Sequence, residues 1–540
     1  MPDIFEEASV ERLVTGGTYV LVFGLLTGLL GWMFMSIASR SDVGVGGEYL
    51  GFITAATSLH VIAMCISGGF HQGLSKYLSE ALVESKEKAL KYAKSAFFIF
   101  NISGLILFII FLIVSITLFP YNLGYGIVFG VMAVAYYLTF FRDNFMGNLA
   151  SVHRFDYIGK LNFLSGIAGI AIGCVILFLV PFPTNALLLP LLIIVSLIVS
   201  IILLFYYGRK VIPYSLTEVF KGANRKEVIE LAKYMLYCTI PNIIFSGAIL
   251  WIQNLWYSGF FSFKTILVSA NGLIIGYSGI VFAICQFGWP QIPAVSEAKA
   301  KNNHDLINDY MKNTLHTGFN ITAFFLIIYI GLSYQLLYLF HGSEYLIALS
   351  PFIILSTAVA ILGIEFLICT LLIGLGEGKK AAYLILTLTL VQLILVPILI
   401  MMLIGVFGPV APETLYAGPV SLLVSSVVVF PFTFHYLKKF TNNPVRDYTS
   451  ILAKGTVSII ITLIFYAILD ITVFPDTAFQ IGLIVRGIVL FGLFTICMLI
   501  FAGYKDKDLE FYEKIPFFKP ILNGMKWILH HSPFYKQEEV

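Results

Sequence analysis

A few ionisable side chains stand inside long apolar runs of this sequence, where a charge is costly and calls for a function or a partner. Glu365 is the one carboxylate well inside such a run, and there it could carry a proton or a sodium ion. His60 lies near the centre of another run and could bind a phosphate group when protonated. Arg142 ends a third run and could attract a lipid phosphate, or it could simply pair with Asp143. Glu365 and His60 likewise have a structural alternative, a hydrogen bond to a neighbouring helix.

The elements that position these side chains follow from the composition. Because 59% of the residues are hydrophobic, 12% are charged and the mean hydropathy is +0.92, we predict an all-α polytopic membrane protein. Fourteen apolar runs are each long enough to cross a bilayer as a helix, which takes roughly 20 residues. The predicted spans are residues 17–38, 49–70, 95–118, 124–146, 161–180, 186–207, 235–257, 265–287, 317–340, 346–373, 381–406, 416–437, 452–473 and 480–502.

The placement of positive charge predicts the orientation. All but three of the 33 lysines and arginines fall at the N-terminus, in the even-numbered loops, in the C-terminal tail or at the span ends beside them. Cytoplasmic loops carry such an excess, so both termini are predicted to be cytoplasmic and the protein to be a multi-pass protein of the cell membrane. Arg40 is an exception, in a predicted outer loop. It could hold a phosphate at the outer exit, or pair with Glu48 to close an outer gate.

Two stretches of the chain repeat one pattern in the same order, which indicates a duplicated unit. The matching pairs are Gly69-Phe70 with Gly288-Trp289, Gln72 with Gln291, Ser79-Glu80-Ala81 with Ser296-Glu297-Ala298, and Tyr92-x-Lys94 with Tyr310-x-Lys312. Six spans per unit is an even number, so both copies enter the membrane in the same sense. We therefore expect two six-helix lobes related by a pseudo-twofold axis along the membrane normal, with the substrate path between them. Gln72 and Gln291 end equivalent inner spans and could line the inward mouth or cap helices.

This organisation divides the chain into five parts. We predict an N-lobe at residues 1–207, an amphipathic cytoplasmic connector at 208–234 and a C-lobe at 235–440. Two further spans follow at 441–502, and an amphipathic cytoplasmic tail occupies 503–540. Basic and apolar residues alternate in the connector and in the tail, which is typical of helices that lie on lipid headgroups.

Several short motifs carry a resemblance to a known family. They are Gly69-Phe70-His71-Gln72-Gly73-Leu74-Ser75-Lys76-Tyr77, Ala38-Ser39-Arg40 before Gly47-Glu48-Tyr49-Leu50-Gly51, and Gly147-Asn148-Leu149 before His153-Arg154-Phe155. With the six-plus-six repeat, the chain resembles the polysaccharide-transporter branch of the multidrug/oligosaccharidyl-lipid/polysaccharide exporter superfamily. The resemblance implies a flippase that moves lipid-linked saccharides from the cytoplasmic to the outer leaflet by alternating access between two lobes.

The chain departs from that family in the seventh span. Relatives often carry an Asp-Arg pair near its outer end, and here the stretch reads Trp251-Ile252-Gln253-Asn254-Leu255-Trp256. Coupling to an ion through a carboxylate at this place is therefore in doubt. The amides of Gln253 and Asn254 could instead hydrogen-bond sugar hydroxyls.

We therefore predict a flippase for a lipid-linked oligosaccharide or polysaccharide repeat unit, carried on a lipid of the polyprenyl phosphate or pyrophosphate type. A cation-coupled small-molecule or multidrug exporter of the same fold is the alternative, although it would need acidic residues inside the first lobe, and spans one, two, five and six have none. A non-transporting scaffold for glycosyltransferases or a polymerase is a third hypothesis. No catalytic triad, paired carboxylates or metal-ligand spacing is present in the sequence, so we expect no enzyme, cofactor, metal or nucleic-acid partner.

Overall fold

The computed structural model describes most of the chain. The described residues are 19–20, 22–24, 26–28, 30–31, 33–34, 46–121, 123–181, 184, 188–245, 249–250, 253, 256–257, 260, 266–281, 288, 290–341, 343–409, 411–438, 445–473, 479–501 and 519–532. Throughout these ranges the secondary structure is helical, as the apolar runs predict. No strand occurs in the part of the chain so described.

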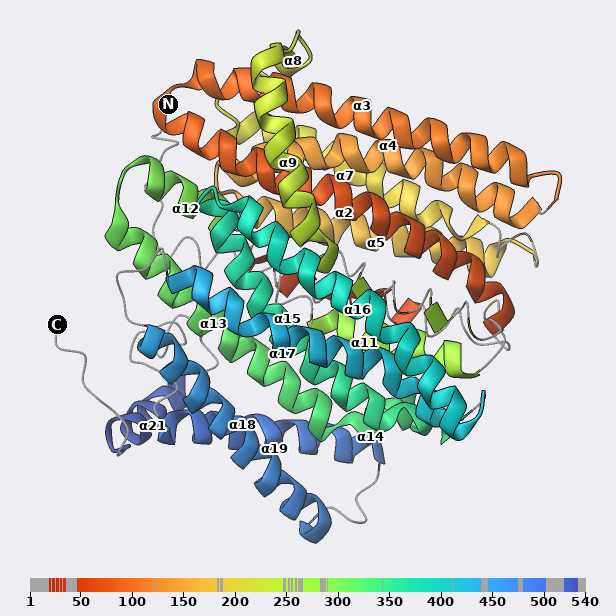
Figure 1. The fold of residues 1–540 in the computed structure, drawn as a ribbon, viewed down its shortest axis with the longest axis vertical. Coiled ribbons are helices and arrows are strands. Elements are labelled where there is room, and N and C mark those ends of the chain that lie inside the picture. The colour runs from red at the N-terminus through yellow and green to blue at the C-terminus, as the bar shows by residue number, and fades with distance from the viewer. Residues whose placement is uncertain are drawn as a thin grey trace.

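The helices are assigned to the predicted lobes by their residue numbers (Figure 1). The N-lobe contains α2 (Gly46–Glu84), α3 (Lys86–Leu118), α4 (Leu123–Ser151), α5 (Phe155–Leu179) and α7 (Leu191–Val211). The C-lobe contains α9 (Arg225–Phe245), α11 (Ile266–Val281), α12 (Gln291–Ala300), α13 (His304–Gly331), α14 (Ser333–His341), η2 (Ser343–Ala348), α15 (Leu349–Gly374), α16 (Gly378–Phe407), η3 (Pro412–Tyr416) and α17 (Ala417–Lys438). The last helices are α18 (Val445–Val473), α19 (Phe479–Ile500) and α21 (Lys519–His530).

Nine helices within the described residues are long and apolar enough to cross a membrane. They cover predicted spans three to six and nine to thirteen. Side chains on the outer faces of α3 and α16, such as Ile113 and Val406, are apolar and exposed, as expected for surfaces that face lipid tails. The chain is thus a multi-pass, all-helical membrane protein.

The connector differs from its prediction as one amphipathic helix. Residues 208–234 form the end of α7, the short helix α8 (Leu216–Val219) and the start of α9. Pro213 disfavours helix at the residue before it, and Ile212 is accordingly extended. Val219 and Leu231 are buried in the core between α2, α3 and α9. Most apolar side chains of the connector therefore pack against protein.

Each lobe has its own core, and α9 bridges the two. Leu74 and Phe100 of the N-lobe are buried in the same cluster as Met235 of α9. The C-lobe core surrounds α15, in which every side chain from Leu362 to Gly374 is buried. Figure 1 shows the N-lobe helices on one side of the molecule with α9 lying across them, α18 and α19 on the opposite side, and the other C-lobe helices between them.

Candidate functional site at the contact between the lobes

The lobes meet where residues 64–77 of α2 cross residues 234–242 of α9. We call this crossing the lobe contact. It lies at the end of the bundle that also holds the α2–α3, α4–α5, α12–α13 and α15–α16 turns. Because the predicted even-numbered loops with their lysines and arginines are found there, we call it the basic end.

Three glycines allow the two helices to approach closely. A Cβ atom on Gly69 would lie closer than 3.0 Å to the backbone of Thr239, and one on Gly68 would collide with the Asn242 amide. One turn further on, a Cβ on Gly73 would press against Met235. Small residues four positions apart are the usual means by which membrane helices bring their backbones together. The Gly68-Gly69 pair therefore sets how near the two lobes can come.

Asn242 uses this close approach to bond to α2. It is fully buried, and its Nδ2 donates to the carbonyl oxygens of Met64 and Cys65, 2.9 Å and 2.8 Å away. Its Oδ1 accepts a hydrogen bond from Gln72 Nε2 at 3.0 Å. Pro241 precedes it inside α9 and cannot donate a backbone hydrogen bond. One amide thus joins the C-lobe to three groups of the N-lobe.

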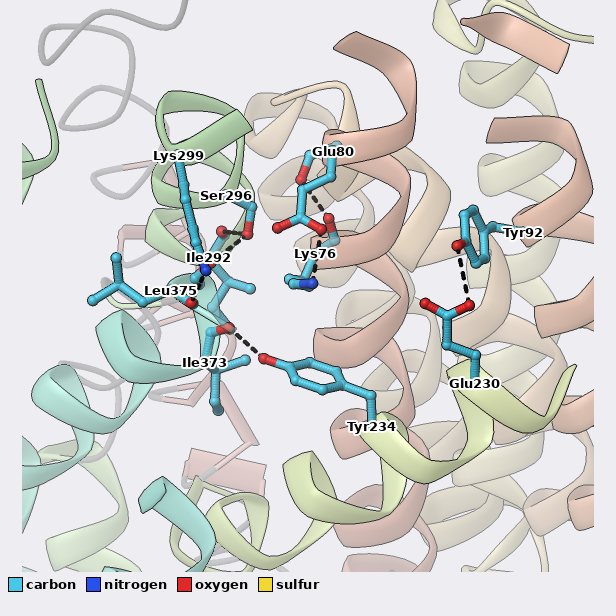
Figure 2. A network of polar contacts seen from close by, with 12 residues as sticks. Lys76, Glu80, Tyr92, Glu230, Tyr234, Ile292, Ser296, Lys299, Ile373 and Leu375 are labelled. Atoms are coloured by element: carbon cyan, nitrogen blue, oxygen red, sulfur yellow. Dashed lines mark hydrogen bonds and ion pairs between the residues drawn. The ribbon is translucent and has the colours of Figure 1, made fainter. Parts of the chain in front are cut away.

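Aromatic and charged side chains extend the lobe contact towards the basic end (Figure 2). Tyr234 of α9 packs edge-on against Tyr77 of α2, with ring centroids 5.4 Å apart. The Lys76 ammonium lies 4.0 Å from the centroid of Tyr77 and 5.0 Å from that of Tyr234, and it also pairs with Glu80 at 2.7 Å. These cation–π contacts connect a buried lysine of one lobe to a tyrosine of the other.

The last carbonyl groups of α15 are bonded by side chains at the same place. Tyr234 donates to the carbonyl of Ile373, Ser296 to that of Gly374 at 2.8 Å and Lys299 to that of Leu375 at 2.6 Å. Helix ends leave such carbonyls without intrahelical partners, so these bonds stabilise the end of α15. Figure 2 shows that Tyr234 lies between this helix end and Lys76. A movement of α9 would therefore change contacts in both lobes.

An ion pair forms a second link between the lobes. His153 stands in the α4–α5 turn with a φ of 59°, a left-handed conformation uncommon outside glycine, and its Nε2 lies 2.8 Å from Glu297 Oε2 of α12. Lys301 also pairs with Glu297, at 2.8 Å. Burial favours the neutral acid, but the hydrogen bonds and charges of His153 and Lys301 outweigh it and lower the pKa of Glu297 to about 2.

Three of the predicted site residues have clear places in this geometry. Gln72 belongs to the lobe contact, although its Oε1 has no partner among the described residues. Arg142 pairs with Asp143, the alternative that the sequence left open, through Nε at 2.8 Å. His60 lies on α2, further from the basic end than the lobe contact, and its Nδ1 is buried without a described partner.

The other described candidates are buried amides and one acid in the C-lobe. Gln291 begins α12, Gln253 lies near Gly418 of α17, and Glu365 stands in the middle of α15. All three side chains are fully buried, and none of their polar side-chain atoms has a hydrogen-bond partner in the part of the chain that the structure describes. Arg40 and Asn254 lie outside the described residues, and Glu48 is described only as part of the α2 backbone.

The sequence did not point to the pairs that join the lobes. Ser296 and Glu297 stood in the repeated pattern, but nothing in the sequence linked Glu297 to His153 or Asn242 to Gln72. No group of three or more metal-ligating side chains occurs among the described residues. The contact is therefore built from hydrogen bonds, rings and one ion pair.

Comparison with known proteins bears on the fold. No protein-family model and no curated protein matches the chain. Among solved structures it resembles a MATE transporter in complex with MaD3S, with a TM-score of 0.66 and 13% identity over 82% of this chain and 98% of that one. An outward-facing multidrug resistance MATE transporter of the MOP superfamily gives 0.64 and 13%, over 81% and 99%. A MOP superfamily transporter from Pyrococcus furiosus, described as having a binding pocket of reverse polarity, gives 0.62 and 12%, over 81% and 100%. The chain thus has the fold of MATE transporters.

Proposed function

We propose that the protein is a transporter that moves a lipid-linked saccharide across the cell membrane by alternating access between its two lobes. The observation that carries the proposal is the lobe contact, because it joins two packed lobes through one buried amide pair, a tyrosine pair and an ion pair. These contacts are directional, so they can break together when α9 moves away from α2, and Met235 of α9 would then leave the cluster that it shares with Leu74 and Phe100. The fold of MATE transporters supports this mode of action.

The basic end is taken to face the cytoplasm, since cytoplasmic loops carry the excess of lysine and arginine. The structure then corresponds to a state closed towards the cytoplasm, because α2 and α9 touch there. In the opposite state, the bonds from Asn242 to α2 and from His153 to Glu297 would be broken. Substrate would enter between the lobes at that stage.

The saccharide assignment is supported by buried amides. Both polar atoms of the Gln253 and Gln291 amides are free of described partners, and an amide can donate to and accept from sugar hydroxyls. The motif resemblance to polysaccharide transporters points the same way. The lipid would be of the polyprenyl phosphate or pyrophosphate type, with its tail left in the bilayer.

A cation-coupled exporter of small molecules is the second candidate, and Glu365 favours it. Its two carboxyl oxygens are buried in the C-lobe with no described hydrogen-bond partner. A bare carboxylate is too costly in such a place, so the group would hold a proton or meet a cation. Ion coupling through Glu365 is compatible with a lipid-linked saccharide and with a small molecule as the substrate. A transport assay distinguishes the two.

The test is translocation by purified protein in proteoliposomes. A fluorescent polyprenyl-diphosphate oligosaccharide is placed in one leaflet, and its arrival in the other is followed with an impermeant quencher. We expect translocation by the unsubstituted protein and at least about a tenfold loss with Gln291→Ala, about 1.4 kcal/mol in the barrier. Gln392→Ala, which removes a buried amide on α16, is the matched control and should stay near the unsubstituted rate.

The same vesicles separate the two candidates. If the labelled lipid does not move but ethidium leaves the vesicles under an imposed ion gradient, the saccharide assignment is wrong and the exporter takes its place. Glu365→Gln should then abolish the gradient dependence. If neither probe moves, the protein is not a transporter of either class.

A further inference from the structure

The N-lobe holds a cluster of ionisable side chains that the proposed function leaves unused. We call it the α2–α4 cluster, made of His60, Ser67 and His71 on α2 and Arg142 and Asp143 on α4. The three α2 residues are spaced by seven and four positions, which places them on one face of the helix. Ser67, His71 and Asp143 are each at most 4% exposed. The cluster is therefore a group of polar side chains inside the packed N-lobe.

The acid of the cluster is already saturated by its neighbours. Asp143 Oδ1 accepts from Arg142 Nε at 2.8 Å and lies 2.7 Å from Arg142 Nη2. Its Oδ2 accepts from Ser67 Oγ at 2.6 Å. The guanidinium and the carboxylate balance each other in charge, and the hydroxyl ties both to α2. Both carboxyl oxygens of Asp143 are therefore engaged within the cluster.

The two imidazoles are the groups whose charge can change. His60 and His71 both interact electrostatically with Arg142 and Asp143, and His60 Nδ1 is buried with no hydrogen-bond partner in the described chain. A solvated imidazole gains or loses a proton close to neutral pH, whereas burial disfavours its charged form. A metal ion would be repelled by the adjacent guanidinium. A proton is thus the ligand that suits this cluster.

Other charged groups on the helices around α2 lie nearer the basic end or in the other lobe. They are Lys76, Glu80 and Glu84 of α2 itself, Lys86, Glu87, Lys88, Lys91 and Lys94 of α3, Arg225, Lys226, Glu227, Glu230 and Lys233 of α9, Glu297 and Lys299 of α12, and Glu365 of α15. Arg142 and Asp143 are the charged groups that act on both His60 and His71. The histidines therefore respond to the α4 pair.

We propose that the α2–α4 cluster is a proton-binding site that couples proton movement to the opening of the lobe contact, with His60 and His71 as the groups that take up and release the proton. This inference rests on the proposed transport function and supplies it with an energy source. One proton adds to an imidazole nitrogen in one conformation and leaves from it in the other. No other group is consumed or changed.

The link to the lobe contact lies in α2 itself. Ser67 faces α4, and the next residue, Gly68, faces Asn242 of α9. Proton uptake gives the cluster a net positive charge, which is costly while it is packed and less costly when water reaches it. The proton therefore binds more strongly to a conformation in which α2 has moved away from its neighbours. Lower pH should open the basic end.

The first experiment measures the conformation without any substrate. Spin labels are placed at the exposed positions Val83 of α2 and Ala300 of α12, after replacement of the native cysteines, and distances are recorded in lipid nanodiscs at about pH 8 and about pH 5. We expect the longer distance to gain population at the lower pH, with about a tenfold change in the ratio of open to closed forms. His60→Gln with His71→Gln should remove the shift.

The matched control is His316→Gln, which replaces a buried histidine of α13 in the C-lobe and should keep the shift. A distance distribution that does not change with pH in the unsubstituted protein would overturn the proposal. So would an undiminished shift in the double histidine variant.

The second experiment separates failure of the coupling from failure of the transport function. Exchange of the labelled polyprenyl-diphosphate oligosaccharide at equal pH on both sides needs no coupling. Net movement driven by a pH difference does. We expect the double histidine variant to retain exchange and to lose the stimulation by the pH difference. If exchange persists and the pH difference still drives transport, the proton site is wrong while the transporter stands. If the unsubstituted protein shows no exchange, the proposed function itself fails.

Discussion

At the scale of single residues, Asn242 is the side chain on which the lobe contact depends most. Interhelical hydrogen bonds within membranes contribute about 0.6 kcal/mol each, so the loss of three in Asn242→Ala should weaken closure by about 2 kcal/mol, roughly twentyfold in population. Met64 and Cys65 keep their helical bonds, and Gln72 loses the acceptor of its Nε2. The check is the labelling rate of a cysteine at Thr239 by an impermeant maleimide from the basic end, which should rise by about that factor.

Asn271→Ala is the control for this prediction, because it removes a fully buried amide from α11, a helix that packs against α15. Its labelling rate should equal that of the unsubstituted protein. Equal rates in the two variants, whether raised or unchanged, would show that the Asn242 amide does not hold the lobes together.

At the scale of elements, the close crossing of α2 and α9 depends on two neighbouring glycines in different ways. Gly68→Ala places its methyl group against the Asn242 side chain, whereas Gly69→Ala places it against the Thr239 backbone. A side chain can be shortened, but a helix backbone cannot. In an Asn242→Ala background, Gly68→Ala should therefore open the contact less than it does in the unsubstituted protein. Gly69→Ala should open the contact equally in both backgrounds. A double-mutant cycle with the same labelling assay measures the two effects.

Gly272→Ala serves as the control at this scale, since no atom of the described residues beyond its own helix lies within 4 Å of its added Cβ and the residue is also helical. It should not open the basic end. Should Gly69→Ala behave like Gly272→Ala, the backbones of α2 and α9 would not be in the contact that the structure shows.

At the scale of the whole molecule, the ion pair between the lobes predicts a response to acid. The pKa of Glu297 is about 2 in the folded protein, below the ordinary value of 4.5, so the ionised carboxylate stabilises the fold fully above about pH 4.5. This contribution is lost as the pH falls from 4.5 through about 2. The midpoint temperature of thermal unfolding in detergent should fall as the pH is lowered through this window. In Glu297→Gln this decrease should be smaller.

The response of the α2–α4 cluster begins at a higher pH than this acid window, because a solvated imidazole takes up a proton close to neutral pH. His153→Ala removes one partner of Glu297, so the pKa of Glu297 should be lowered less. The lower pH limit of the acid window should therefore rise. An unfolding profile in Glu297→Gln that overlays that of the unsubstituted protein would mean that the pair adds nothing to stability.

The sequence predicted the architecture better than the site, for a physical reason. Hydrophobic runs and charge placement are local signals, and nine of the fourteen predicted spans correspond to helices that, within the described residues, are long and apolar enough to cross a membrane. Gln72 and Arg142 were found because a polar residue at a span end is conspicuous. Its partner is not, since Asn242 lies 170 positions from Gln72 along the chain. The resemblance to polysaccharide transporters stays a prediction, because the solved structures bear on the superfamily fold and not on its branches.

Helix α15 has a consequence for the biosynthesis of the protein. Its side chains from Leu362 to Gly374 are all buried, and α13, α11, α12 and α17 pack around it. On the ribosome, α15 emerges after α11, α12 and α13 but before α17, so the face of α15 that α17 covers must first sit beside lipid. The C-lobe can close around it only after residue 438 has been made. Truncation of the nascent chain before α17 should therefore leave α15 open to lipid crosslinkers, and Glu365 would be the residue that makes the waiting helix hardest to insert.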